Sequence, residues 1–340
     1  MRSRADHFTR REFVSGLTAG AAGLLGLRPE GAAAEPPPET TRLRVHHSES
    51  LCLAPQYVAE DLLRAEGFTD VQYVRPYGPG PAGVYQALES GDADISNDFA
   101  TVVITRLDRG SPLVVLAGVH VGCFELFGTE RIRTIRDLKG KTVGVRGLET
   151  PPHMFLASMV AHVGLDPRKD ITWAIHPSDE SIRLLARREI DAFVGFPPEP
   201  QELRAKQIAR VVVNSALDRP WSQYFCCMTI ASREFVRKSP VATKRAVRAM
   251  LKAADICALE PDRAAHTLVD RGLTSRSDYA AQTMKDVVYN KWREYDPEDT
   301  LRFYALRLRE AGMIKSSPQK IIAQSTDWRF INELKKEMKT

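Results

Sequence analysis

Short apolar segments alternate with helix-length segments along most of this chain, and this alternation constrains the fold more than any other feature. Helices are expected at residues 53–66, 82–90, 97–109, 151–164, 178–188 and 198–205. Strands are expected at residues 43–47, 71–74, 93–95 and 112–119, and again at 141–146, 171–176, 190–196 and 208–214. Strands that alternate with helices predict mostly parallel sheets with helices on both faces, and therefore an α/β protein.

The pattern restarts near residue 141 and carries a weak internal repeat. Residues 87–95 (ALESGDADI) and 186–194 (ARREIDAFV) both consist of a helix end, a tight turn and a strand. Two similar α/β units in one chain predict two similar lobes. A strand at 224–230 is expected to return to the first lobe, and five helices are expected to follow, at 241–259, 261–270, 279–288, 297–311 and 328–338.

The first 34 residues have the order of a secretory signal. A basic patch with Arg10-Arg11 precedes an apolar stretch at 16–27, and Ala32-Ala33-Ala34 offers small residues for cleavage after Ala34. The Arg-Arg-x-Phe pattern resembles the twin-arginine signal, so export to the periplasm is expected. The alternative is a membrane anchor, but the apolar run is short for a bilayer. Residues 35–41 form a Pro-rich linker that we expect to be disordered.

Charge and motifs exclude several classes of function. The formal net charge is +5, with 48 Lys and Arg against 43 Asp and Glu interspersed along the chain, so no nucleic-acid partner is expected. No P-loop, GxSxG or HExxH motif occurs. We therefore expect neither catalysis nor a cofactor.

Five cysteines are present, at positions 52, 123, 226, 227 and 257. An odd number in an exported chain leaves at least one free thiol. No CxxC pair or Cys–His spacing typical of zinc ligands occurs, and alternation along a strand would point Cys226 and Cys227 to opposite faces. The cysteines are therefore expected to be small buried apolar residues, with no metal site.

One segment carries a resemblance to a known family. Residues 135–145 (IRDLKGKTVGV), with the turns at 91–95 and 190–193, resemble the periplasmic substrate-binding proteins of sulfonate, taurine and nitrate importers, the NMT1/THI5-like family. The likeness extends over about residues 43–259. It implies the two-lobed type II periplasmic-binding fold, with residues 42–122 plus 220–340 as lobe 1 and 123–219 as lobe 2. It also implies a small-molecule ligand in the interlobe cleft and an ABC importer permease as partner, and we expect a monomer.

Ligands of open α/β sheets bind at the carboxyl ends of the strands, and this rule selects candidate contacts. Several of these candidates also have a purely structural interpretation: Asn97 and Thr150 as helix caps, Tyr77 and Phe196 as core side chains, and His153 as a surface residue. The acids Glu49, Asp98 and Glu199 favour a zwitterionic, cationic or heteroaromatic ligand over a bare sulfonate or nitrate, unless Arg75 or Arg146 offsets them. The candidate ligand-binding residues are Ser48, Ser50, Tyr77, Asn97, Asp98, Thr150, His153, Phe196, Glu199 and Tyr224.

Two alternatives share the implied fold. The first is a THI5-like pyrimidine-precursor synthase or a related enzyme; those synthases carry a Cys-rich iron motif, to which only Cys226-Cys227 could correspond here. The second is a sensor subunit that presents a ligand to a membrane protein. The sequence does not separate transport from sensing, so both stay open.

Overall fold

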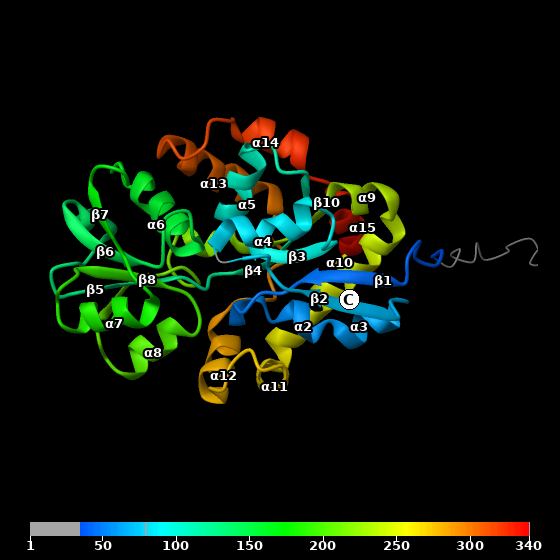
Figure 1. The fold of residues 1–340 in the computed structure, drawn as a ribbon, viewed down its shortest axis with the longest axis horizontal. Coiled ribbons are helices and arrows are strands. Elements are labelled where there is room, and N and C mark those ends of the chain that lie inside the picture. The colour runs from blue at the N-terminus through cyan, green and yellow to red at the C-terminus, as the bar shows by residue number, and fades with distance from the viewer. Residues whose placement is uncertain (1–34, 79, 340) are drawn as a thin grey trace, which may run out of the picture. The chain divides into compact units, whose positions relative to one another are not determined.

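Two five-stranded sheets organise the chain in the computed structural model, which describes residues 35–78 and 80–339 (Figure 1). Sheet A has the strand order β2-β1-β3-β10-β4, and sheet B the order β7-β6-β8-β5-β9. The strands of sheet A are β1 (Arg42–His46), β2 (Asp70–Val74), β3 (Ile95–Phe99), β4 (Leu113–Val121) and β10 (Phe225–Ser232). Those of sheet B are β5 (Glu125–Gly128), β6 (Lys141–Val145), β7 (Ile171–Ile175), β8 (Ala192–Gly195) and β9 (Arg210–Asn214).

The two sheets have the same plan. In each, four strands run one way and a single strand runs against its neighbours, β10 in sheet A and β5 in sheet B. The chain passes between the sheets twice, from β4 to β5 and from β9 to β10. The predicted α/β class, with a mostly parallel sheet in each lobe, is confirmed. The division into residues 42–122 plus 220–340 and 123–219 stays our proposal, with both cuts in these crossings.

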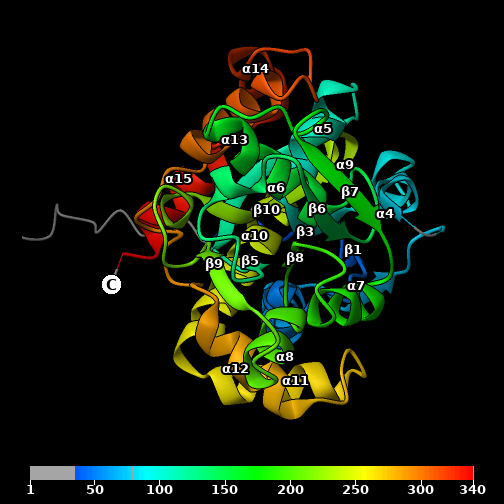
Figure 2. The same ribbon diagram turned by 90° about the vertical axis from the view of Figure 1, so that its left-hand side faces the viewer.

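Helices cover both sheets. In Figure 1, α6 lies on one side of sheet B, and α7 and α8 lie on the other. Figure 2, seen from the side of sheet B, shows α8 beside α12 of the other lobe, where the Gln201 amide donates to the Asp286 carboxylate at 2.9 Å. The helices are α2 (Pro55–Val58), α3 (Glu60–Ala65), α4 (Gly80–Glu89), α5 (Ala100–Asp108), α6 (Pro151–His162), α7 (Ser178–Ala186), α8 (Glu199–Ala205), α9 (Arg233–Lys238), α10 (Pro240–Leu259), α11 (Pro261–Asp270), α12 (Ser277–Asp286), α13 (Pro297–Glu310), α14 (Pro318–Ser325) and α15 (Arg329–Glu337), with short 3₁₀ turns η1 (Leu51–Leu53), η2 (Ile135–Leu138) and η3 (Trp221–Gln223).

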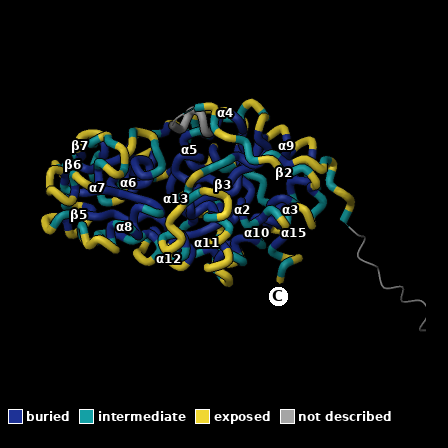
Figure 3. Tube along the Cα trace, turned by 60° about the horizontal axis from the view of Figure 1, so that its bottom comes forward, coloured by how far each residue is buried: buried dark blue, intermediate teal, exposed yellow. Residues whose placement is uncertain are grey.

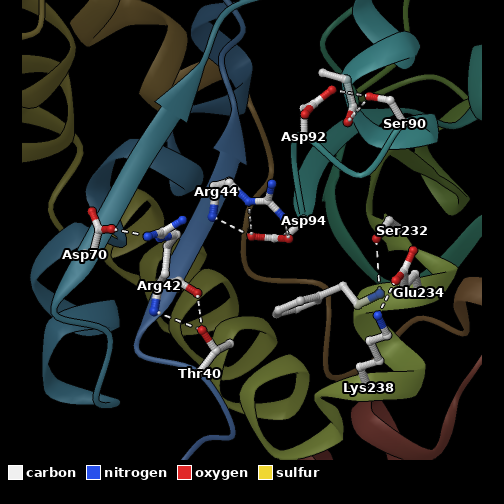
Figure 4. A network of polar contacts seen from close by, with 12 residues as sticks. Thr40, Arg42, Arg44, Asp70, Ser90, Asp92, Asp94, Ser232, Glu234 and Lys238 are labelled. Atoms are coloured by element: carbon white, nitrogen blue, oxygen red, sulfur yellow. Dashed lines mark hydrogen bonds and ion pairs between the residues drawn. The ribbon is translucent and has the colours of Figure 1, made fainter.

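The internal repeat has a structural cause. Asp94 exchanges two hydrogen bonds with the backbone of Arg44 in β1, through its amide and its carboxylate, each 2.7 Å long. Asp191 makes the same two bonds with Thr142 in β6, at 2.9 and 3.0 Å. Figure 4 shows the Asp94 end, where the Arg44 guanidinium also pairs with the carboxylate at 2.6 Å. Asp92 and Asp191 are both the sixth residue of their repeat segments, but Asp94 is the structural counterpart of Asp191.

Several elements differ from the sequence expectation. The helix expected at 53–66 is divided among η1, α2 and α3, and β5, α9 and α14 were not expected. Asn97 and Asp98 belong to β3, and α5 begins only at Ala100, so neither residue caps that helix. The strand continues because Asn97, Asp98 and Phe99 pair with β10, a tertiary contact that the local sequence does not reveal.

The interior and the start of the described chain complete the fold. Buried residues run through both sheets, and exposed residues lie on the outer loops and helix faces (Figure 3). The linker was expected to be disordered, but the Glu39 carboxylate accepts from Val241 and Ala242 in the first turn of α10, at 3.0 and 2.9 Å. The signal predicted for residues 1–34 lies outside the described residues. No helix among residues 35–78 and 80–339 is long and apolar enough to cross a membrane.

Candidate functional site

A cavity of about 590 Å³ opens where the carboxyl ends of strands from both sheets face each other. Sheet A contributes the segments that follow β1, β2 and β3, and sheet B contributes those that follow β6 and β8, with the first turn of α6. This is the position that the strand-end rule predicts for a ligand. The lining residues are His46, His47, Ser48, Glu49, Ser50, Arg75, Pro76, Gly78, Tyr85, Asp98, Phe99, Val102, Arg146, Thr150, Pro151, Pro152 and Phe196.

Three buried polar side chains, Asp98, Tyr85 and His46, lie on the sheet A side of the cavity, and the last two have hydrogen-bonding atoms without a partner. Asp98 accepts from the Phe99 amide at 2.7 Å through one oxygen, and burial raises the pKa of its carboxyl to about 6. The Tyr85 hydroxyl is buried without a hydrogen bond of good geometry; burial and then the nearby Asp98 carboxylate raise the pKa of its phenol. Both ring nitrogens of His46 are buried without a partner among the described residues, and burial lowers its pKa to about 4.

The Tyr85 hydroxyl and the His46 ring need partners, because a buried polar atom without a hydrogen bond costs about 1–3 kcal/mol. At neutral pH, Asp98 is mainly an acceptor, whereas neutral His46 offers one donor and one acceptor. The cavity therefore has a polar side whose unused atoms suit a ligand with both N–H or O–H groups and acceptors.

Aromatic rings form another wall. Phe99, at the end of β3, and Phe196, just after β8, meet edge to face with ring centroids 5.3 Å apart. Phe124, in the first crossing, packs against Phe99 at the same centroid distance. Because Phe99 and Phe196 come from different sheets, a ring bound against them would contact both lobes.

Charged groups stand at the edge of the cavity. Arg75 and Glu49 make no ion pair within the described residues. Arg146 is held by Glu199 at 2.5 Å and lies over the Phe196 ring, 5.1 Å from its centroid. Glu199 also accepts from the Phe196 amide at 3.1 Å, so this buried carboxylate positions both neighbours.

The loop that leads into α6 is fixed by its own contacts. Thr150 donates to the Gly147 carbonyl at 2.7 Å, and the His153 ring accepts from the Glu149 amide at 3.0 Å. Burial lowers the pKa of His153 to about 4, which keeps the ring neutral and able to accept. Glu149 has a left-handed backbone, with φ of 62°, and its carboxylate pairs with Arg109 of the other lobe at 2.6 Å.

Five of the ten sequence candidates line the cavity: Ser48, Ser50, Asp98, Thr150 and Phe196. Glu199 and His153 are not among the lining residues: Glu199 holds Arg146, and His153 holds the Glu149 loop and lines a separate hollow. Thr150 occupies the N-cap position of α6, but its side chain makes no hydrogen bond to the first turn of that helix.

The remaining three candidates lie elsewhere. Tyr77 is 56% exposed, and its hydroxyl donates to Asp92 at 2.6 Å. Asn97 is buried in sheet A, where its side-chain oxygen accepts from Thr229 at 2.8 Å. Tyr224 stacks on Phe303 with centroids 4.0 Å apart. None of the three side chains lines this cavity.

Sequence reasoning missed part of the lining. His46 and His47 are not among the sequence candidates, because only one of two neighbouring strand residues can face a cleft; β1 in fact ends at His46, and both residues line the cavity. Tyr85 and Val102 project from helices α4 and α5, so a rule based on strand ends does not find them. The sequence indicates Arg75 and Arg146 only as charges that offset the acids, whereas both line the cavity.

A thiol cluster lies beside the cavity, which corrects the expectation that the cysteines do not converge. Cys52, Cys123, Cys226 and Cys227 gather around His120, all buried. Alternation fails at Cys226 because β10 carries a bulge there: Phe225 pairs with Val121 and Cys227 with His120, which leaves Cys226 as an extra residue. Two groups of three that share His120, one with Cys52 and Cys123 and one with Cys226 and Cys227, have donor atoms close enough together to hold a metal ion.

Comparisons with known proteins agree with this geometry. The family described as NMT1/THI5 like matches residues 54–264. No curated protein matches the chain at a significant level.

Solved structures share the fold. The periplasmic nitrate-binding protein NrtA from Synechocystis PCC 6803 has a TM-score of 0.70 at 14% identity, covering 89% of this chain and 90% of that one. The alkanesulfonate-binding protein SsuA from Xanthomonas axonopodis pv. citri, bound to MOPS, has a TM-score of 0.64 at 17% identity, covering 87% and 100%. A sulfonate-binding protein of a putative sulfonate ABC transporter from Methylobacillus flagellatus KT has a TM-score of 0.62 at 17% identity, covering 87% and 94%. The predicted two-lobed periplasmic-binding fold is therefore confirmed.

Proposed function

This chain belongs to the NMT1/THI5-like family, whose match covers more than half of it, and on that premise we propose that it is an extracytoplasmic solute-binding protein of an ABC importer. The observation that carries the proposal is the cavity between the two sheets, which combines unused buried polar groups with aromatic rings from both lobes. A ligand that bridges both lobes stabilises their closed arrangement, which is how such proteins signal occupancy to a permease.

The cavity lining favours a small planar organic ligand that carries both donors and an acceptor or anionic group. Asp98 and the His46 acceptor would take N–H or O–H groups, and Arg75, which has no ion pair among the described residues, would take an acidic or carbonyl oxygen. Phe99 and Phe196 would pack against a ring. A bare nitrate would leave Asp98 facing an anion, so we expect a zwitterionic or heteroaromatic molecule instead.

The alternatives are less well supported. The three solved neighbours named above are described as binding proteins, which supports binding rather than the synthase activity. Among the described lining residues, no hydroxyl or thiol nucleophile is hydrogen-bonded to a histidine. A sensor subunit would use the same cavity, so genes encoded beside this one would distinguish sensing from import.

A thermal-shift screen tests the proposal. The mature chain would be melted with sulfonates, nitrate, pyrimidines, flavins, polyamines and aromatic acids, because a ligand of the native state raises the midpoint by mass action. We expect a hit among nitrogen-containing ring compounds, together with compaction in small-angle scattering. A hit that causes no compaction would argue against closure of the lobes, and turnover of the hit would argue for an enzyme.

Export is the second part of the proposal, and it rests on residues 1–34. The periplasmic protein should begin at or near Glu35 when its N-terminus is sequenced by mass spectrometry. Replacing Arg10 and Arg11 by Lys should block export, because the twin-arginine receptor recognises the arginine pair. Recovery of an intact Met1 would contradict cleavage, and normal export of the lysine variant would contradict the twin-arginine route alone.

A further inference from the structure

Four thiols and one imidazole converge beside the ligand cavity from three separate parts of the chain. Cys52 lies in η1, His120 in β4, Cys123 in the first crossing, and Cys226 and Cys227 in β10. The donor atoms of Cys52, His120 and Cys123 lie within 4.8 Å of one another, as do those of His120, Cys226 and Cys227. All five residues are buried, with Cys123 the most exposed at 7%.

The His120 ring is oriented as a ligand. Its Nδ1 lies 2.9 Å from the Gly122 carbonyl oxygen, which can only accept, so the N–H of the neutral ring is on Nδ1. Nε2 therefore carries a lone pair; it is fully buried, and the Cys52 thiol beside the ring makes no hydrogen bond of acceptable geometry to it. Metal-ligating histidines characteristically donate their other N–H to a backbone carbonyl in this way.

The donor types select the class of metal. Thiolates and imidazole suit soft and borderline transition ions, whereas calcium and magnesium require oxygen ligands. Two Zn–S bonds of about 2.3 Å at a tetrahedral angle separate their sulfurs by about 3.8 Å. The sulfurs of Cys226 and Cys227 lie 3.9 Å apart, and those of Cys123 and Cys226 lie 2.9 Å apart. A modest outward movement of Cys123 is enough to admit the ion.

We propose that His120 and three of the four clustered thiolates bind one Zn²⁺ in a closed, four-coordinate site. A Cys123–Cys226 disulfide is the competing outcome, since these two sulfurs are close and the chain is proposed to be exported. In that outcome the Cys52 thiol, which lies beside His120, would donate to its free ring nitrogen, and the measurements below distinguish the disulfide from the metal site.

The site would connect the ligand cavity to the crossing between lobes. Cys52 follows the lining residue Ser50 by two positions, and Cys227 pairs in the sheet with the lining residue Phe99. Cys123 belongs to the first crossing. A zinc ion here would join these three segments and hold one wall of the cavity in place. The assignment does not depend on the proposed transport function.

Metal analysis of the exported protein, purified without chelator, tests the proposal. We expect about one zinc per chain. The Cys123→Ser/Cys226→Ser variant should lose the zinc. The matched control is Cys257→Ser, because Cys257 is also buried but lies in α10, outside the cluster, and it should keep the zinc. Zinc content that is equal in all three proteins would place the metal elsewhere and overturn the assignment.

Two further measurements keep the proposal testable if the double variant does not fold. Wild-type protein stripped of metal and reloaded with Co²⁺ should show intense near-ultraviolet thiolate-to-cobalt absorption and the visible bands of a tetrahedral ion. Intact-mass analysis should show five free thiols after removal of the metal. A mass lighter by two hydrogens, with no cobalt absorption by the reduced protein, would identify a disulfide and contradict the metal site.

Discussion

The rings of Phe99 and Phe196 meet edge to face with centroids 5.3 Å apart, and each comes from a different sheet. Because both rings also line the cavity, one wall of the candidate site exists only where the two lobes meet. A ligand packed there would contact both lobes at once. The first prediction follows from this pair.

Replacing Phe196 by Leu should weaken ligand binding about two- to tenfold, because an aromatic contact is worth about 0.5–1.5 kcal/mol beyond its buried area. Calorimetric titration with the ligand found by the screen measures the change. The matched control is Phe193→Leu, a buried ring of β8 that does not line the cavity. Both variants should be less stable than wild type, but only Phe196→Leu should bind the ligand more weakly. If both variants lost the same affinity, Phe196 would not belong to the site.

Asp98→Asn should make the protein more stable at neutral pH. Burial raises the pKa of the Asp98 carboxyl from its ordinary value of 3.8 to about 6, so the folded state holds this proton more tightly than the unfolded state. The resulting loss of stability is absent below about pH 4, grows between about pH 4 and 6, and is fully present above that window.

Melting curves measure this effect. At pH 7.5 the variant should gain on the order of 1–3 kcal/mol over wild type, and at pH 4 it should gain nothing. Asp61→Asn, at an exposed position on α3, serves as the control for removing a carboxylate, and it should not reproduce the gain over wild type at pH 7.5. A destabilised Asp98→Asn variant at pH 7.5 would show that the carboxylate is satisfied without a ligand.

Glu149→Gln should weaken closure of the lobes slightly. Glu149 pairs with Arg109 across the lobes, but both side chains are about half exposed, which limits the pair to about 1 kcal/mol. Ligand affinity should therefore fall at most about fivefold, and Arg109→Gln should add nothing further in the double variant. Asp278→Asn removes an exposed pair within one lobe and should leave affinity unchanged. Additive losses from Glu149 and Arg109 would show that the two residues act separately.

Glu39→Ala should lower stability without affecting the site. Its carboxylate accepts from two amides in the first turn of α10, and loss of a helix cap costs about 0.5–2 kcal/mol. Denaturant unfolding measures the loss, and ligand affinity should remain that of wild type. A variant as stable as wild type would return this segment to the disordered linker that its Pro-rich sequence predicts.

The fold was largely predictable because its signals are local. The alternation of strands and helices, and the turns before β3 and β8, already indicate two similar lobes. The elements that were missed depend on tertiary contacts: β5 is a four-residue strand held between β8 and β9, and Asn97 stays in a strand because it pairs with Thr229.

The site was only half predictable for the same reason. The strand-end rule found Ser48, Ser50 and Asp98, which follow or end strands of sheet A. It could not find Tyr85, which reaches the cavity from a helix. The convergence of Cys226 and Cys227 was missed because a bulge breaks the alternation of β10, and single-residue insertions of this kind leave no pattern in the sequence.

The most direct test of the proposed binding site is a calorimetric titration of wild type, Asp98→Asn and Tyr77→Phe with the best ligand from the screen. We expect one ligand per chain in wild type. Loss of the Asp98 contact should weaken binding by about 1–3 kcal/mol, or roughly five- to more than a hundredfold. Tyr77→Phe should bind as wild type does, because its hydroxyl points to Asp92 outside the cavity. Saturable binding that Asp98→Asn leaves unchanged would place the ligand elsewhere and contradict the site.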